Sequence, residues 1–482
     1  MQLSVVMPVL GFLLMVFSLS NIPPMIVGLI YGEAEISLFI YTFFLTLLGG
    51  MSMWLPYRKV RGNMKTRDGF VITVLFWLVL GLVGSLPFLM MDAPSLSITD
   101  AIFESMSGLT TTGATILTGL DDMPRSILFY RQQIQWFGGM GIIVLAVAIM
   151  PMLGIGGMQL YRTETPGPVK DSKLTPRIKE TAKALWTLYV ALTVTCAIGY
   201  KLAGMDWFDA ISHSFSTIAI GGFSTHDASI GYFQSPLINA MTTFFMFFAG
   251  INFALHFFAW RNKTASHYFK DSEVKGYVLI LSTVALITVF TLYASNTYGF
   301  WTSFEYGLFE VVSIATTTGY STTGFSVWPT FLPLLLFITS FVGGCAGSTA
   351  GGMKVVRIML IFKQGVRELY RLVHPNAILT IKLGGQPVNS RVGEAVWGFF
   401  ATYVFLLVVM FLLLMATGLD IVTAFTTVAS CLNNLGPALG DAYSNYQTLP
   451  DAAKWILTFA MLLGRLEIFT LLVLFTPVFW RY

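Results

Sequence analysis

Four short segments offer the clearest chemistry in this sequence, because each can bind a cation through its backbone. None contains an ionisable side chain, so their ligands are backbone carbonyls and a few hydroxyls. A ring of carbonyls can replace the hydration shell of a monovalent cation, and glycine permits the φ values that turn successive carbonyls toward one axis. The segments are 110–113 (TTTG), 219–222 (AIGG), 316–319 (TTTG) and 433–436 (NNLG).

Each segment ends in a glycine, called here an anchor glycine, that marks a longer internal repeat. A serine stands six residues before every anchor, and a small residue stands twelve residues before it. An apolar run precedes and follows each anchor, which predicts four copies of helix, half-helix, loop and helix. Alternatively, the glycines only let membrane helices pack closely. The anchors are Gly113, Gly222, Gly319 and Gly436, the serines are Ser107, Ser216, Ser313 and Ser430, and the small residues are Ala101, Ala210, Gly307 and Ala424.

The composition predicts an all-α polytopic membrane protein. The chain is 55% hydrophobic and 11% charged, whereas a soluble domain has about 25% charged residues. Ten apolar runs are long enough to cross a bilayer as helices, and none alternates as barrel strands do. The uncharged first run lacks the basic start of a cleaved signal, so we expect a retained helix. The runs are 4–29, 36–55, 69–91, 127–150, 184–204, 235–260, 276–297, 331–364, 393–417 and 453–479.

The repeat and the charge distribution together predict the organisation of the chain. With ten spans, 23 of the 28 basic residues fall on one side of the membrane, together with both termini. The positive-inside rule makes that side the cytoplasm. The cysteines Cys196, Cys345 and Cys431 and the five histidines lack metal-ligand spacing. The predicted parts are two N-terminal helices in 1–56 and four pore repeats in 69–150, 184–260, 275–365 and 392–482.

The four predicted half-helices begin with capping residues and end before the anchor glycines. Because a helix C-terminus bears partial negative charge, four such ends that converge would favour a cation. Glu104 and Glu310 lie within half-helices, and we expect them to satisfy neighbouring groups rather than bind ions. The predicted caps are Thr99 with Asp100, Asp206, Thr302 with Ser303, and Asp420, and Thr302 with Glu305 has capping-box spacing.

A glycine-rich segment interrupts the predicted last helix of the third repeat. Five of the ten residues in 343–352 are glycine, and each costs about 1 kcal/mol relative to alanine inside a helix. A phosphate-binding loop is excluded because Met353 separates Gly352 from Lys354 and no strand precedes the segment. Small residues permit a flexible plug near the axis, and the alternative is an ordinary kink for helix packing.

Arg465 lies inside the last apolar run, where an arginine is expensive unless it faces protein or water. We hypothesise that its charge opposes cations below the predicted site, together with 343–352. The alternative is a structural ion pair with Glu467 or with another carboxylate.

Five motifs resemble the Trk/Ktr/HKT superfamily of potassium transporters, most closely its bacterial TrkH/TrkG branch. They are TTTGAT (110–115), AIGGFST (219–225), TTTGYSTTGF (316–325), CLNNLGP (431–437) and GGCAGSTAGGMK (343–354). The resemblance covers nearly the whole chain, including the two N-terminal helices. It implies a potassium selectivity filter made mainly of backbone carbonyls. The implied filter residues are Thr111, Thr112, Gly113, Ile220, Gly221, Gly222, Thr317, Thr318, Gly319, Asn434, Leu435 and Gly436.

The resemblance also implies a gate, partners and a location. The segment 343–352 would be an intramembrane loop that gates the pore from below the filter. The partners would be membrane lipid, a second copy in a homodimer, and a cytoplasmic nucleotide-binding subunit of the TrkA type, in a bacterial inner membrane. The implied gate residues are Gly343, Gly344, Cys345, Ala346, Gly347, Ser348, Thr349, Ala350, Gly351 and Gly352.

The predicted function is potassium uptake through a gated, channel-like pore. Each repeat has its anchor glycine in the implied filter, but no second glycine stands two residues after that anchor. We therefore expect K⁺ to be selected over Na⁺ only moderately. A K⁺/H⁺ or K⁺/Na⁺ symporter is the alternative, although such carriers usually have inverted repeats and ionisable groups at the midplane. The sequence shows no catalytic constellation, no nucleic-acid motif and no fold for an organic cofactor, so K⁺ is the only ligand expected.

Overall fold

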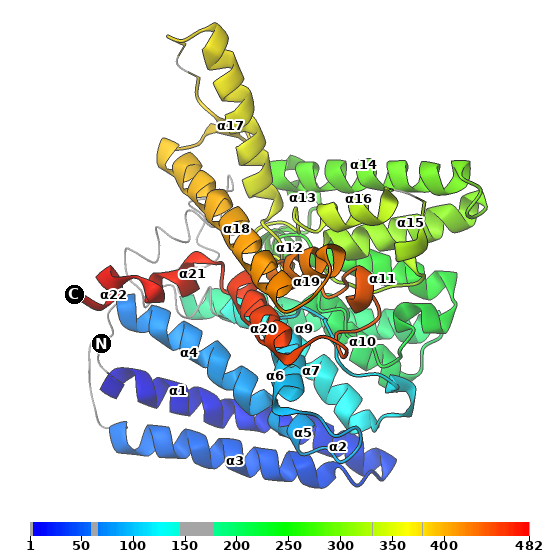
Figure 1. The fold of residues 1–482 in the computed structure, drawn as a ribbon, viewed down its shortest axis with the longest axis vertical. Helices are drawn as coiled ribbons and strands as arrows, with labels where there is room; N and C mark the ends of the chain where they lie inside the picture. The colour runs from blue at the N-terminus through cyan, green and yellow to red at the C-terminus, as the bar shows by residue number, and fades with distance from the viewer. Residues whose placement is uncertain (1–2, 59–65, 145–177, 330, 378, 482) are drawn as a thin grey trace.

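The computed structural model describes residues 3–58, 66–144, 178–329, 331–377 and 379–481, and these are almost entirely helical (Figure 1). The basic segment 161–183 and the end of the predicted run 127–150 lie largely outside the described residues. Within those residues the only strands are β1 (Lys382–Leu383) and β2 (Gln386–Pro387), which form an antiparallel pair.

The N-terminal helices form a layer along one side of the molecule (Figure 1). They are α1 (Leu3–Ser18), η1 (Leu19–Asn21), α2 (Ile22–Tyr31), α3 (Ile36–Trp54) and η2 (Leu55–Tyr57). Gly11 and Gly50 let α1 and α3 touch, because a methyl group on Gly11 would lie 2.6 Å from the Gly50 carbonyl oxygen. Close approach through small residues is the usual way in which membrane helices associate.

Four half-helices lie inside the fold, each with other helices before and after it in the chain. They are α6 (Ile98–Leu109), α10 (Trp207–Ala219), α15 (Phe300–Ala315) and α19 (Ile421–Asn433), and the loops after them contain η3 (Leu120–Asp122), η5 (Ser229–Phe233), η6 (Phe325–Val327) and η7 (Gly440–Ala442). The helices around them are α4 (Thr66–Gly84), α5 (Leu86–Leu89), α7 (Arg125–Val144), α9 (Ile178–Ala203), α11 (Pro236–Ala249), α12 (Phe253–Arg261), α13 (Ser266–Lys270), α14 (Ser272–Ala294), α16 (Leu332–Thr339), α17 (Val355–Val373), α18 (Ser390–Ala416), α20 (Asp451–Arg465), α21 (Phe469–Leu472), η8 (Val473–Phe475) and α22 (Pro477–Arg481).

The described helices give fewer straight spans than the ten that were predicted. Six are long and apolar enough to cross a membrane unbroken, and two bent pairs raise the number to eight if each pair is one span. The predicted runs 235–260 and 453–479 are therefore not straight helices. The first bends by 94° between α11 and α12, and the second by 107° after α20.

Local backbone demands explain both bends. Asn252 starts α12 afresh, because its side chain caps that helix by accepting from the Ala254 N–H at 2.8 Å. After α20, Glu467 takes a positive φ of 50°, which a continuing helix cannot contain. The predicted break in the third repeat is also present, with irregular backbone between α16 and α17.

Two of the four predicted helix caps are confirmed and two are wrong. Asp206 accepts from the Asp209 N–H at 2.7 Å, and Asp420 accepts from the Val422 N–H at 2.9 Å. The cap of α6 is Ser97, two and three residues before the predicted Thr99 and Asp100, and the N-cap position of α15 is Gly299, which has no side chain to cap the helix. The predicted capping-box residue Glu305 instead accepts from the side chain of Asn239 at 2.7 Å.

Candidate cation-binding site

All four half-helices end in the same backbone turn. In each repeat the anchor glycine and the residue two before it have positive φ, and the residue between them donates its N–H to the carbonyl of the repeated serine. The φ values are 54° and 81° at Thr111 and Gly113, 55° and 79° at Ile220 and Gly222, 64° and 81° at Thr317 and Gly319, and 55° and 97° at Asn434 and Gly436. The N–H···O distances are 2.9 Å from Thr112 to Ser107, 2.9 Å from Gly221 to Ser216, 2.8 Å from Thr318 to Ser313 and 2.9 Å from Leu435 to Ser430.

The anchor glycines bring the four loops together in a closed ring. A methyl group on any anchor would strike the carbonyl oxygen of the residue that precedes the next anchor. The separations would be 2.2 Å from Gly113 to Gly221, 2.0 Å from Gly222 to Thr318, 2.2 Å from Gly319 to Leu435 and 2.6 Å from Gly436 to Thr112. Only glycine fits these positions, and the contacts run through repeats one, two, three, four and back to one.

The fourth loop departs from the others in sequence, and its asparagine side chains support the scaffold. Asn434 donates to Thr112 Oγ1 at 3.0 Å and to the Met461 carbonyl at 2.9 Å. Asn433 accepts from the hydroxyl of Tyr403 at 2.6 Å. Their amide groups are thus engaged by protein, and the ring itself is left with backbone carbonyls.

Glu104 tethers the backbone that leaves the first loop. The three residues after each anchor glycine are called here the exit segment. Glu104 accepts from Thr115 Oγ1 and from the Ile116 N–H, both at 3.0 Å, and from Arg131 Nε at 2.8 Å. The prediction that Glu104 satisfies neighbouring groups is confirmed.

Glu310 occupies the same position in the third repeat and makes the same kind of tether. It accepts from the N–H of Thr322 at 2.8 Å and from its hydroxyl at 3.1 Å. The prediction for Glu310 is likewise confirmed. In the second repeat His213 takes this place, with Nε2 3.0 Å from Ser224 Oγ. Three half-helices thus hold their own exit segments through one equivalent side chain.

Arg131 joins the first repeat to the second, and the sequence analysis missed it. Its guanidinium donates to Glu104, to Thr115 Oγ1 at 3.0 Å and to the Ser224 carbonyl at 3.1 Å. The residue is 1% exposed. A buried arginine in an apolar run predicts a functional or structural partner, and that signal was available in the sequence.

Gln135, one turn further along α7, was also missed. Its side-chain oxygen accepts from Ser216 Oγ at 2.7 Å and from the Phe223 N–H at 3.1 Å, and its amide donates to the Gly221 carbonyl at 2.6 Å. Gln135 therefore contacts α10 at Ser216 and the second loop on both sides of its anchor, at Gly221 and Phe223. An isolated glutamine carries little sequence signal, because its remote partners are not visible in the pattern.

The segment 343–352, called here the intramembrane loop, lies against the ends of three half-helices. Thr349 Oγ1 donates to the Ile218 carbonyl at 3.0 Å, the Gly351 N–H donates to Thr317 Oγ1 at 2.7 Å, and the Gly352 N–H donates to the Asn433 carbonyl at 3.0 Å. A methyl group on Gly351 would lie 1.9 Å from that Asn433 oxygen. The loop is thus pressed directly against the ring.

Arg465 reaches the intramembrane loop through backbone carbonyls. Its guanidinium donates to the Gly138 carbonyl at 2.7 Å and to the Thr349 carbonyl at 3.4 Å, and the residue is 5% exposed. Glu467, the carboxylate considered as its ion-pair partner, forms an ion pair with Arg357 at 2.6 Å. The geometry therefore couples Arg465 to the loop.

A histidine fastens the first repeat to the second on the side where the half-helices begin. His226 Nδ1 lies 2.5 Å from Asp121 Oδ1, and His226 Nε2 lies 3.2 Å from Asp209 Oδ2. The His226 ring stacks on the ring of Tyr232, with centroids 3.5 Å apart. Burial lowers the pKa of His226, but the hydrogen bonds to Asp209 and Asp121 outweigh it and raise the pKa above 6.5. We call this cluster the outer clasp.

Comparison with known proteins agrees with this architecture. The family described as TrkH, cation transport protein, matches residues 35–482. The chain belongs to the TrkH family. It is 56% identical to the Trk system potassium uptake protein TrkH of Halomonas elongata over 481 residues and 56% identical to that of Vibrio parahaemolyticus, with both chains fully covered. It is 41% identical to the Trk system potassium uptake protein TrkG of Escherichia coli, covering 98% of this chain and 97% of that one.

A solved structure extends the TrkH likeness to three dimensions. The crystal structure of the potassium transporter TrkH from Vibrio parahaemolyticus matches with a TM-score of 0.92 and 53% identity, and both chains are fully covered. The resemblance inferred from the five motifs is therefore confirmed, and so is the predicted all-α membrane fold.

The anchor ring of this TrkH-family chain can be tested with two glycines of the first repeat. Gly113 and Gly119 both have positive φ, so alanine at either adds about 1–2 kcal/mol of backbone strain. Only Gly113→Ala adds the clash with Gly221, since nothing lies within 4 Å of the corresponding position at Gly119. We expect Gly113→Ala to lose monovalent-cation flux in proteoliposomes while Gly119→Ala keeps it. Equal flux in the two variants would contradict the ring.

The outer clasp predicts a pH-dependent stability. Because the pKa of His226 is raised in the folded protein, its contribution is complete below pH 6.5 and is lost as pH rises through the raised pKa. We expect the thermal midpoint of the wild type to exceed that of His226→Gln most at acidic pH. The excess should shrink as the pH rises above 6.5 through the raised pKa of His226. An excess that grows with pH would refute the prediction.

Proposed function

We propose that this TrkH-family chain takes up potassium across the cell membrane through a gated, channel-like pore. The supporting observation is the closed ring of four loops, whose anchor positions admit only glycine. The ring offers carbonyls and no ionisable side chain, which suits a dehydrated monovalent cation. The relatives from Halomonas elongata and Vibrio parahaemolyticus are named potassium uptake proteins. K⁺ is therefore proposed as the transported ion.

The proposed selectivity filter comprises the anchor glycines and the two residues before each. Its selectivity is proposed to be moderate, because no repeat has a second glycine two residues after its anchor and the exit segments leave the ring at once. Those exit segments are bound to Glu104, Glu310 and Arg131 rather than to further ring positions. The proposed filter is thus short. An ion that passes through it meets fewer carbonyls than it would if the exit segments continued the ring.

The proposed gate consists of the intramembrane loop and Arg465. The loop binds the half-helix ends below the ring, and Arg465 binds the loop at the Thr349 carbonyl. A positive charge beside the path of a cation raises the barrier to permeation. Opening is proposed to require the loop to leave these contacts.

The proposed partners are membrane lipid, a second copy of this chain and a cytoplasmic nucleotide-binding subunit of the TrkA type. The relatives' description as parts of a Trk system supports a multicomponent assembly. Helix α17 starts beside α14 and α18, projects beyond the body of the molecule (Figure 1) and exposes large apolar side chains, among them Phe362, Leu369 and Leu372. Exposed apolar side chains in this number mark an interaction surface, and we assign it to the second copy.

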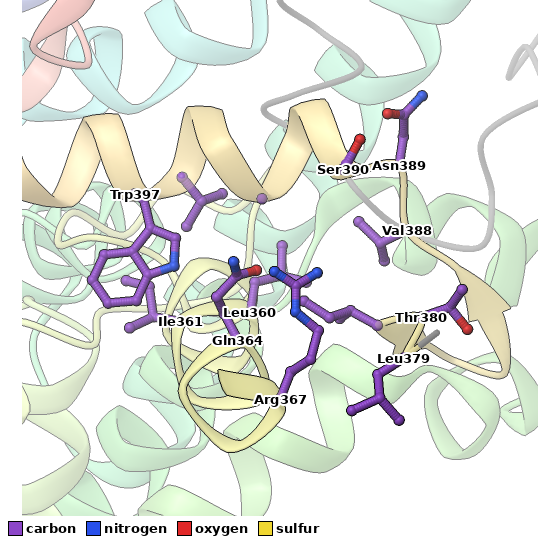
Figure 2. A pocket seen from close by; sticks show the side chains of 13 residues that line it. Leu360, Ile361, Gln364, Arg367, Leu379, Thr380, Val388, Asn389, Ser390 and Trp397 are labelled. Atoms are coloured by element: carbon purple, nitrogen blue, oxygen red, sulfur yellow. The ribbon is translucent and has the colours of Figure 1, made fainter. Parts of the chain in front are cut away.

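A pocket lies beside α17. It lies between α17, the β1–β2 hairpin and the start of α18, and Figure 2 shows Trp397, Arg367 and Leu379 around it. The proposed location is the bacterial inner membrane with both termini in the cytoplasm, which places this pocket on the cytoplasmic side.

Ion flux into proteoliposomes tests the proposed function. We expect K⁺ uptake to exceed Na⁺ uptake and to proceed down the K⁺ gradient without a proton gradient. A bi-ionic measurement with K⁺ on one side and Na⁺ on the other gives the selectivity. Uptake that required a proton or Na⁺ gradient would instead establish the K⁺/H⁺ or K⁺/Na⁺ symporter. Absence of any preference for K⁺ would refute the filter.

The gate is tested by shortening the intramembrane loop and by Arg465→Ala. Both changes remove a barrier below the filter, so we expect each to raise K⁺ flux at equal amounts of protein in the membrane. Arg465→Lys, which keeps the charge, should stay closer to the wild type. Unchanged or lower flux in both barrier-removing variants, with normal folding by size-exclusion chromatography, would count against the gate.

A further inference from the structure

The intramembrane loop is closed at its base by backbone contacts. The Val355 N–H donates to the Gly344 carbonyl at 3.1 Å, and the Met353 N–H donates to the Phe341 carbonyl at 3.0 Å. Gly343 and Gly352 pack so closely that a methyl group on Gly343 would lie 3.0 Å from the Gly352 Cα. The two ends of the loop are therefore adjacent. A contact that fixes this base also restricts the movement of the rest of the loop.

Helix α17 begins at this base without a capping side chain of its own. The N-cap position is Lys354, whose side chain makes no capping bond and instead donates to the Ala350 carbonyl within the loop. The first N–H groups of a helix have no partner inside that helix. Another part of the chain must therefore accept the Val356 N–H.

Glu273, in the first turn of α14, supplies that acceptor and also binds the loop. Its Oε1 accepts from the Val356 N–H at 3.2 Å and from the Ala346 N–H at 2.7 Å. A carboxylate at a helix N-terminus is favourable because it faces the positive end of the helix dipole. One oxygen atom of Glu273 thus joins the start of α17 to Ala346 in the first half of the intramembrane loop.

We propose that Glu273 is the latch that couples α17 to the intramembrane loop. The inference rests on the proposed gate, and it specifies how the gate is held. While both N–H groups bind Glu273, the loop stays seated under the ring. A partner that pulls α17 away from α14 breaks both bonds together, and the loop base is then free to move. Glu273 acts through the loop and is a positioning residue.

The native cysteine next to Ala346 provides a direct readout of the latch. Cys345 is fully buried, and its N–H donates to the Gly250 carbonyl at 2.9 Å. A loop that leaves its seat exposes this thiol, so the rate of labelling with a maleimide measures opening independently of transport. Cys196 and Cys431 are replaced by alanine so that only Cys345 reacts.

The experiment uses the full-length chain in proteoliposomes without an added partner. We expect Glu273→Ala to raise both the Cys345 labelling rate and the basal K⁺ flux about tenfold, which corresponds to about 1.4 kcal/mol in the opening equilibrium. Glu273→Gln keeps an acceptor oxygen and should remain close to the wild type. The matched control Glu394→Ala removes an exposed carboxylate of α18 and should change neither readout.

Three outcomes would overturn the latch. The first is unchanged labelling in Glu273→Ala at a wild-type thermal midpoint, and the second is identical behaviour of Glu273→Gln and Glu273→Ala. If Glu273→Ala does not fold, Glu273→Asp takes its place, because the shorter aspartate side chain cannot reach both N–H groups. The third outcome is unchanged Cys345 labelling in Glu273→Asp. If the wild type passes no K⁺ at all, the proposed function fails, while the labelling rates still decide the latch.

Discussion

The close contact between each anchor glycine and the next repeat's carbonyl is the constraint on which the structure depends. It leaves no room for a Cβ atom at the four anchor positions, so the four loops can form the ring only with glycine at each anchor. The surrounding helices must then hold the repeats in register around the ring. They do so through polar ties between repeats. Lys454 of the fourth binds Asp100 of the first at 2.6 Å, and Asn239 of the second binds Glu305 of the third.

The backbone of the ring is nearly fourfold, whereas the side chains that support it are not. Gln135 supports the second loop from α7, and Asn434 joins the fourth loop to Thr112 of the first. Glu104 forms an ion pair with the buried Arg131, while Glu310 accepts from two hydroxyls and one N–H group of its exit segment. Because carbonyls bind the ion in the proposed filter, each repeat can vary its support as long as the turn is kept.

The sequence predicted those features that repeat and missed those that depend on remote partners. The anchors, the half-helix ends and the break at 343–352 follow from glycine spacing and apolar runs, which are local signals. The bends after Ala249 and Arg465 were missed because each run is apolar enough as a whole to be read as one span, although Asn252 lies at the first break and Arg465 and Glu467 flank the second. The cap at Ser97 was missed because Thr99 and Asp100 offer the same chemistry two and three residues later. Arg131 acts on Ser224, 93 residues away, and no periodicity reveals such a pair.

The contacts of the intramembrane loop give the proposed gate a second, electrostatic role. A half-helix C-terminus attracts cations through its unpaired carbonyls, and the loop binds two of these, at Ile218 and Asn433. The seated loop therefore covers part of the negative potential below the ring, and Arg465 adds a positive charge at the same place. Moving the loop away would clear the path and free those carbonyls together. In the proposed gate, steric opening and cation attraction would thus be one event, and a small loop displacement would change permeation strongly.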